Sequence, residues 1–128
     1  MSDQFKLAIV EDNQTLASEL ELVFSQSDWE VYLADCGEEL DYIMRHQDIK
    51  LIILDLNLPG EDGIDILKRV KAAYPSIGVI ILTARITSSN KIEGYEAGAD
   101  IYITKPARAK ELIFAANNLL QRLVTDRE

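Results

Sequence analysis

The sequence predicts an α/β fold in which five parallel strands form one sheet covered by helices. Short runs of aliphatic and β-branched residues alternate with longer stretches of helical period, which is the rhythm of successive βαβ units. Several of the short runs are too continuously apolar to leave one face in water, and strands buried on both faces belong to parallel sheets. Right-handed crossovers then favour a doubly wound sheet with strand order 2-1-3-4-5.

The first half of the chain supplies two strands and two helices. A strand at residues 6–10 leads into a helix at about residues 14–26. That helix is indicated by a stripe of apolar residues at helical spacing, namely Leu16, Leu20, Val23 and Phe24. The second strand is expected at residues 30–34, and a shorter helix near residues 38–46.

The middle of the chain repeats this alternation. The third strand is expected at residues 50–54, followed by a helix near residues 64–74. The fourth strand is expected at residues 78–82 and a helix at residues 88–97. Gly98 is the expected C-terminal stop of that helix, because glycine adopts the left-handed conformation that ends many helices.

The fifth strand, at residues 100–103, and the last helix, at about residues 109–123, complete the alternation. The helix is indicated by a stripe of four apolar residues, namely Leu112, Ala116, Leu119 and Leu123. No repeat or linker interrupts the pattern. We therefore expect one domain at residues 1–124 and a tail, or the start of a linker, at residues 125–128.

Composition narrows the classes of function. A length of 128 residues suits a single core. The net charge of -9, without a Lys/Arg cluster, argues against direct contact with nucleic acid or an anionic membrane. No apolar run approaches the roughly 18 residues needed to span a bilayer. Cys36 is the only cysteine, which excludes an internal disulfide and suits a reducing compartment. We expect a cytoplasmic protein.

Charged residues end three of the expected strands. Asp55 follows the third strand, Glu11 and Asp12 follow the first, and Lys105 follows the fifth. Because ligands bind at the carboxyl ends of strands in such sheets, these groups should converge on one crevice beside the switch point between the first and third strands. Three carboxylates facing one ammonium indicate a site for Mg²⁺ and phosphate.

The segments at these strand ends resemble the receiver domain of two-component response regulators, which has a flavodoxin-like (βα)5 fold. The similarity runs from Lys6 to about Leu123. It is carried by Ile9–Asn13, Leu54–Gly60 with Gly63, Leu82–Ala84, Gly98–Asp100 and Tyr102–Pro106. The sequence is most similar to receivers that carry a winged-helix DNA-binding domain.

The resemblance implies a role for each residue at the metal. Asp55 would be the phosphoacceptor and a Mg²⁺ ligand. Asp12 would bind Mg²⁺ directly, Glu11 through water and Asn57 through its backbone carbonyl. This set suits the chemistry, since a carboxylate can attack phosphorus if a hard cation neutralises the transferring oxygens. Alternatively, Asp12 could be only a helix N-cap.

The resemblance also implies a switch. Lys105 would pair with the phosphoryl oxygens, and the bond to Pro106 would be cis. Thr83 would hydrogen-bond the phosphoryl group, and Tyr102 would rotate into the space that opens. The plainer alternatives are a solvated loop lysine, a trans turn proline, a strand-end threonine and a half-buried edge-strand tyrosine.

The function that follows is a switch which takes a phosphoryl group from a sensor histidine kinase or a histidine phosphotransfer protein. Such a domain catalyses only its own phosphorylation and dephosphorylation, and an output such as transcription would need a domain outside this chain. A homodimer would use the last two helices and the last strand. Ala115 and Asn117 stand where that class usually has arginines, which weakens the case for its charged dimer face.

Two other functions start from the same carboxylate. One is an aspartate-nucleophile phosphohydrolase, but such enzymes commonly have a second aspartate where this chain has Asn57, and they need a cap or a longer sheet. The other is a pseudo-receiver, which binds partners without being phosphorylated. Turnover of a phosphate monoester would identify the first, and failure to accept a phosphoryl group from a small donor would identify the second.

Overall fold

The computed structural model describes residues 4–126 and contains five strands and five helices in strict alternation. In chain order they are β1 Phe5–Val10, α1 Gln14–Gln26, β2 Trp29–Ala34, α2 Gly37–His46, β3 Ile49–Leu54, α3 Gly63–Ala73, β4 Gly78–Thr83, α4 Ser88–Glu96, β5 Ile101–Thr104 and α5 Ala109–Asp126. All neighbouring strands are parallel, and the sheet has the order β2-β1-β3-β4-β5. The predicted fold and strand order are confirmed.

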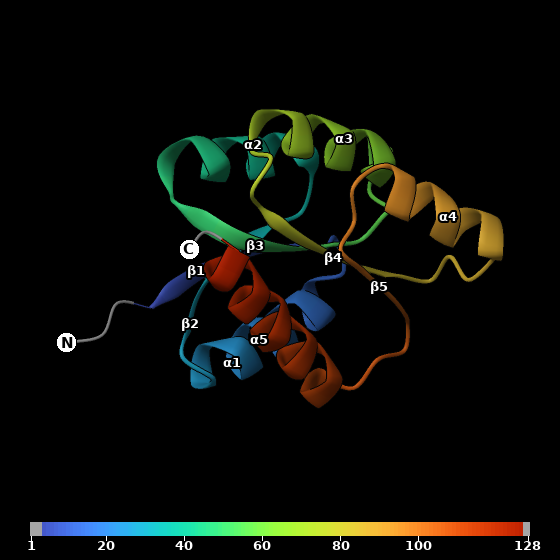
Figure 1. The fold of residues 1–128 in the computed structure, drawn as a ribbon. Coiled ribbons are helices and arrows are strands. Elements are labelled where there is room, and N and C mark those ends of the chain that lie inside the picture. Colours follow the sequence, from blue (N-terminus) through green and yellow to red (C-terminus); the bar gives the residue numbers. More distant parts are fainter. Residues whose placement is uncertain (1–3, 127–128) are drawn as a thin grey trace.

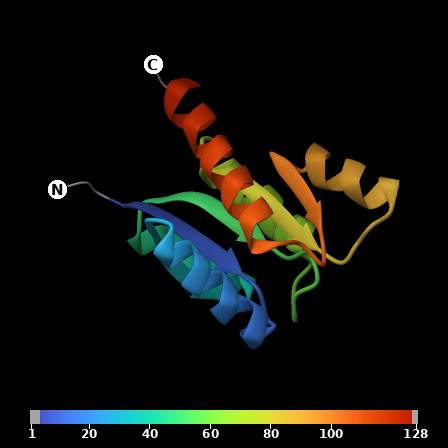
Figure 2. The ribbon, with the colours of Figure 1, turned by 90° about the horizontal axis from the view of Figure 1, so that it is seen from below.

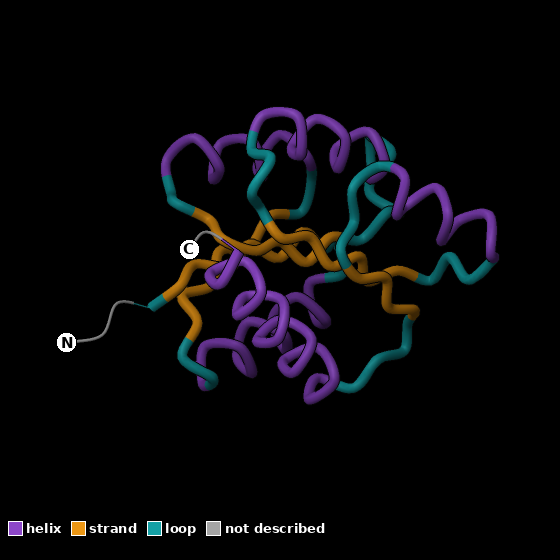
Figure 3. The backbone as a smooth tube through the Cα atoms, in the orientation of Figure 1, coloured by secondary structure: helices purple, strands orange, loops and turns teal. Residues whose placement is uncertain are grey.

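The helices form a layer on each face of the sheet. Figure 1 shows α2, α3 and α4 on one face and α1 and α5 on the other, and Figure 3 shows the strands as the layer between them. Figure 2, turned by 90°, shows α1 and α5 crossing the same face. Successive residues of a strand point to opposite faces, so β3 sends Ile52 and Leu54 to one core and Leu51 and Ile53 to the other. Its continuous apolar run thus has no side in water.

Polar caps fix where three helices begin. Asn13 caps α1 by accepting from the backbone N–H of Leu16 at 3.0 Å, and Asp62 caps α3 by accepting from Ile64 at 3.0 Å. Thr87 caps α4 through the N–H of Asn90. Because Asn13 is the N-cap of α1, the alternative in which Asp12 has that role is wrong.

Helix α4 buries very little of its surface against the sheet. Gly94 is its only buried residue. A Cβ at Gly94 would lie 2.9 Å from Cδ1 of Ile81 and 3.0 Å from two ring atoms of Tyr102. The backbone of α4 therefore lies directly on the Tyr102 ring. The helix ends as predicted, with Gly98 at φ +115°.

Some predicted strand boundaries were wrong because of contacts with segments distant in the sequence. Strand β2 begins at Trp29, whose ring is buried against Phe24 and whose Nε1 donates to Oδ1 of Asn117 at 3.1 Å. Asp100 precedes β5, because its carboxylate accepts from the backbone N–H of Val79 at 2.9 Å.

Two further boundaries lie beyond their expected ends. Thr83 is the last residue of β4, and α5 runs on to Asp126. The helix therefore includes half of the predicted tail, whose remainder lies outside the described residues; the domain boundary at residue 124 stays a prediction. No helix in the described part of the chain is long and apolar enough to cross a membrane.

Candidate functional site

The carboxyl ends of β1, β3 and β5 bring the predicted acidic residues and the lysine together. Glu11, Asp12 and Asp55 each offer a carboxylate oxygen, and these atoms lie within 4.8 Å of one another. Oxygen atoms from several carboxylates are the donors that a hard divalent cation takes. The residues present therefore fit Mg²⁺.

Two of these carboxylates are buried and bonded at both oxygens. Nζ of Lys105 donates to Oε1 of Glu11 at 2.7 Å and to Oδ2 of Asp55 at 2.9 Å. The second oxygen of Glu11 accepts from the backbone N–H of Asn13, and that of Asp55 from the N–H of Asn57, each at 3.0 Å. Glu11 and Asp55 are only 4% and 5% exposed, so this pairing offsets the cost of burying their charges.

Asp12 lies at the solvent side of this cluster. It is exposed, whereas Glu11 and Asp55 are buried. A metal entering from water would therefore reach Asp12 without first breaking the ion pairs of Lys105. The direct metal contact of Asp12 and the water-mediated contact of Glu11 stay predictions.

Lys105 is part of the site rather than a solvated loop charge. Burial lowers the pKa of its ammonium, but hydrogen bonds to Glu11 and then to Asp55 outweigh this, so the pKa is raised above the usual lysine value. Its backbone N–H donates to the carbonyl of Thr83 at 2.8 Å. The peptide bond to Pro106 is cis, the geometry that the resemblance implies.

The two residues predicted as a switch both lie inside the protein. Thr83 is fully buried, and its hydroxyl oxygen is 3.5 Å from the backbone nitrogen of Arg85. Tyr102 is buried as well, and its hydroxyl donates to the carbonyl of Arg85 at 2.9 Å. The Tyr102 ring already lies in the interior of this structure, and its rotation on phosphorylation stays a prediction. Desolvation raises the pKa of Tyr102, and the charge of Arg85 opposes this.

Arg85 makes contacts at the site that its sequence context did not predict. Its Nε donates to Oδ1 of Asn57 at 2.8 Å, and its Nη2 donates to the carbonyl of Leu56 at 3.2 Å and to Oδ1 of Asp62 at 3.4 Å. The place of Arg85 in the sequence could have indicated these contacts, because Arg85 lies just after β4, at the edge of the sheet where the site residues gather.

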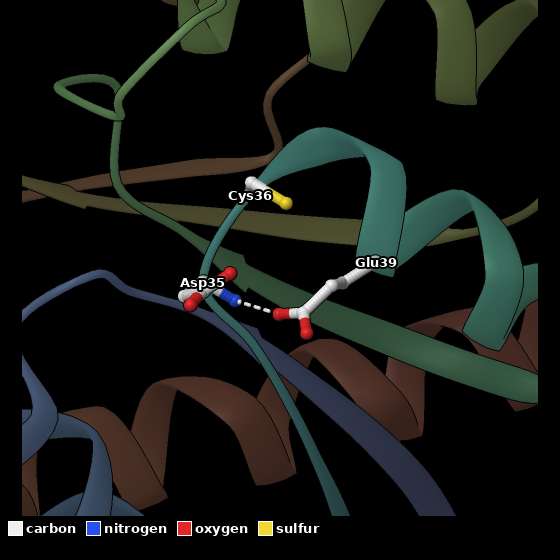
Figure 4. A group of neighbouring side chains, drawn as sticks. All are labelled: Asp35, Cys36 and Glu39. Atoms are coloured by element: carbon white, nitrogen blue, oxygen red, sulfur yellow. Dashed lines mark hydrogen bonds between the residues drawn. The ribbon is translucent and has the colours of Figure 1, made fainter.

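A second group of possible metal ligands lies at the start of α2. Asp35, Cys36 and Glu39 have ligand atoms within the same 4.8 Å limit, and Figure 4 shows the backbone N–H of Asp35 bonded to the Glu39 carboxylate. That bond, at 2.7 Å, ties the loop to the helix. Both acidic residues are exposed, and we assign this group no function.

Comparisons with known proteins identify the family. The family model described as the response regulator receiver domain matches residues 7–117. The chain belongs to this family. The receiver domain is 38% identical over 117 residues to the TorCAD operon transcriptional regulatory protein TorR of Escherichia coli K12, covering 91% of this chain and 50% of that protein. It is 39% identical over 116 residues to the aerobic respiration control protein ArcA of the same strain, covering 91% of this chain and 48% of that protein.

Solved structures support the fold of the receiver domain. A CheY-like receiver domain from Methanospirillum hungatei JF-1 superimposes with a TM-score of 0.93 over 97% of this chain and 99% of that one, at 22% identity. The receiver domain spans about half the length of the curated relatives it matches. Receivers of this family bind Mg²⁺ through acidic residues, and a cluster of acidic residues, Glu11, Asp12 and Asp55, is present in this structure.

Proposed function

We propose that this receiver domain accepts a phosphoryl group on Asp55 from the phosphohistidine of a sensor histidine kinase or a histidine phosphotransfer protein. The observation that carries the proposal is the position of the Asp55 carboxylate, which is buried, paired with Lys105 and adjacent to the carboxylates of Glu11 and Asp12. Incubation with acetyl phosphate and Mg²⁺, followed by mass spectrometry, tests the proposal.

In the reaction an Asp55 oxygen attacks phosphorus, the bond from phosphorus to the histidine nitrogen breaks, and the histidine leaves with that electron pair. Asp12, Asp55, the Asn57 carbonyl and, through water, Glu11 would hold Mg²⁺. The metal would neutralise the negative charge on the transferring oxygens. The domain would catalyse only this step and the later hydrolysis of its own acyl phosphate.

Lys105 can form ion pairs at the site both before and after phosphoryl transfer. It now bonds one oxygen of Asp55, and Glu11 holds the same ammonium from the other side. When Asp55 becomes an acyl phosphate, the ammonium can turn to a phosphoryl oxygen while Glu11 retains it. Charge-assisted bonds of this type are about twice as strong as neutral ones.

The metal assignment leads to the first prediction. Three carboxylates close together repel one another, so a bound cation should stabilise the folded state. A ligand present at ten times its dissociation constant adds about 1.4 kcal/mol. Mg²⁺ should therefore raise the melting temperature by a few degrees, as measured by differential scanning calorimetry, and Asp12→Ala should lose most of this shift.

The matched control is Asp35→Ala, which removes an exposed carboxylate from the second acidic group. This variant should keep the full effect of Mg²⁺, because Asp35 is not one of the proposed ligands. A full Mg²⁺ shift in Asp12→Ala would show that the ligand set is wrong.

Thr83 provides the second prediction. After phosphorylation its hydroxyl would bond a phosphoryl oxygen, which would disturb the loop that carries Arg85 and thereby Tyr102. Beryllofluoride, a stand-in for the phosphoryl group, should therefore shift the NMR signals of Tyr102 and α4 in the wild type. In Thr83→Ala these shifts should be lost, while signals near Asp12 and Asp55 still change.

Thr104→Ala is the control for this experiment, since Thr104 is paired with Thr83 in the neighbouring strand. It should leave the response of Tyr102 intact. Equal responses of Tyr102 and α4 in the wild type and Thr83→Ala would remove Thr83 from the switch.

We propose that the surface formed by α4, β5 and α5 contacts the partner that receives the signal. Helix α4 exposes Ile92 and Tyr95, and α5 exposes Phe114, which suits contact with a second copy of the domain or another partner. Asn117 accepts a hydrogen bond from Trp29 and carries no charge, so it cannot contribute to a charged dimer face. By analogy with TorR, the full protein would regulate transcription, with DNA contacted by another domain.

A further inference from the structure

Arg85 connects the two loops that border the proposed phosphorylation site. Its guanidinium donates to oxygen atoms of Leu56 and Asn57, which directly follow Asp55, and to Asp62, the N-cap of α3. Asn57 and Asp62 both lie in the β3–α3 loop, residues 55–62, and form a β-bridge with each other. One side chain from the β4–α4 loop thus bonds to the β3–α3 loop both just after Asp55 and at Asp62, the last loop residue.

The same residue makes a second connection through its main chain. The carbonyl of Arg85 accepts the hydroxyl hydrogen of Tyr102 at 2.9 Å. The Tyr102 ring in turn lies against the backbone of α4 at Gly94. The chain of contacts therefore runs from the residues beside Asp55, through Arg85, to Tyr102 and α4.

The chemistry of the side chain suits this role. A guanidinium is planar and carries five N–H donors in a fixed arrangement, so it can bond a carbonyl, an amide oxygen and a carboxylate at once. The Arg85 side chain is 24% exposed, which leaves its bonds partly shielded from water. A lysine would bring the charge without the fixed arrangement of donors.

We propose that Arg85 is a positioning residue that holds the β4–α4 loop against the β3–α3 loop and so sets the buried position of Tyr102. This proposal rests on the proposed function in one respect, because it makes Arg85 the link by which metal binding at the Asn57 loop reaches Tyr102. The anchoring of Tyr102 itself requires no metal.

The first arm of the test uses the metal-free protein with isotope-labelled tyrosine rings. Arg85→Met keeps much of the side-chain volume and removes every donor. Its Tyr102 ring signals should shift, and the ring should become more accessible to a soluble paramagnetic agent. Arg108→Met, which changes an exposed arginine before α5, should leave both properties unchanged.

The second arm adds Mg²⁺ alone. In the wild type, backbone signals of Asp12 and Asn57 and ring signals of Tyr102 should all shift. In Arg85→Met the backbone signals should still shift while the Tyr102 response is lost. Arg85→Lys should also lose most of it, because the ammonium cannot reproduce the three-way contact.

The outcomes separate this inference from the proposed function. An unchanged Tyr102 ring in metal-free Arg85→Met, or a full Mg²⁺ response of Tyr102 in either Arg85 variant, would overturn the inference. Absence of any Mg²⁺ shift at Asp12 and Asn57 in the wild type would instead contradict the proposed metal site. In that case the metal-free arm would still decide whether Arg85 anchors Tyr102.

Discussion

Asp55→Asn should abolish phosphorylation by acetyl phosphate in the presence of Mg²⁺. Asparagine has nearly the shape of aspartate, but its amide cannot form the acyl phosphate, so the nucleophile is lost with little change in packing. Intact-protein mass spectrometry should show one added phosphoryl group on the wild type and none on the variant. The expected effect is complete loss rather than a lower rate.

Asp35→Asn is the matched control, because it makes the same chemical change at an exposed carboxylate outside the proposed site. It should be labelled like the wild type. Label that persists on Asp55→Asn would place the phosphoacceptor at another residue, and failure of the wild type to gain label would favour the pseudo-receiver alternative.

Lys105→Met should destabilise the fold by about 3 kcal/mol when Mg²⁺ is absent. The ammonium pairs with two carboxylates whose side chains are only 3% and 6% exposed, and breaking a buried pair costs about 3 to 5 kcal/mol. The lower end applies because the Lys105 side chain itself is 24% exposed. Urea denaturation at pH 7 measures the difference, and Mg²⁺ should restore part of it.

Lys50→Met gives a close comparison, since the Lys50 side chain is 25% exposed but its partner, Asp48, is 82% exposed. A surface pair of this kind contributes about 0 to 1 kcal/mol. Equal losses of unfolding free energy in the two variants would show that the Lys105 pairs do not stabilise the fold.

The stabilisation by Lys105 should depend on pH. Because the pKa of Lys105 is raised in the folded state, the stabilisation is fully present below the ordinary lysine pKa of 10.5 and is lost as pH rises through the higher folded-state value.

Much of the fold could be predicted because the signals were local. The continuous apolar run of β3 predicted a strand buried on both faces, and the strand is buried on both faces in the structure. Gly98 ends α4 at the position predicted for it. The gathering of Glu11, Asp12, Asp55 and Lys105 followed from topology alone, because parallel strands end at one edge of the sheet.

The remaining features depend on contacts between distant segments. Asp100 looked like the start of a strand, but it bonds the backbone of Val79 in the neighbouring strand. The role of Arg85 depends on oxygen atoms at least 23 residues away in the chain. The position of Tyr102 depends on a glycine in α4 that lets its ring lie beneath the helix. Spacing along the sequence carries none of this information.

The sparse burial of α4 has a thermodynamic consequence. Elements that bury few apolar contacts open or shift locally at a small fraction of the free energy of global unfolding. Helix α4 buries only Gly94, whereas α3 buries Gly63, Ile64, Ile66, Leu67 and Val70. A phosphoryl-dependent bias of a few kcal/mol could therefore reposition α4 while α3 and the sheet keep their packing. Such a division would let one domain combine a rigid phosphorylation site with a helix that moves readily when Asp55 is phosphorylated.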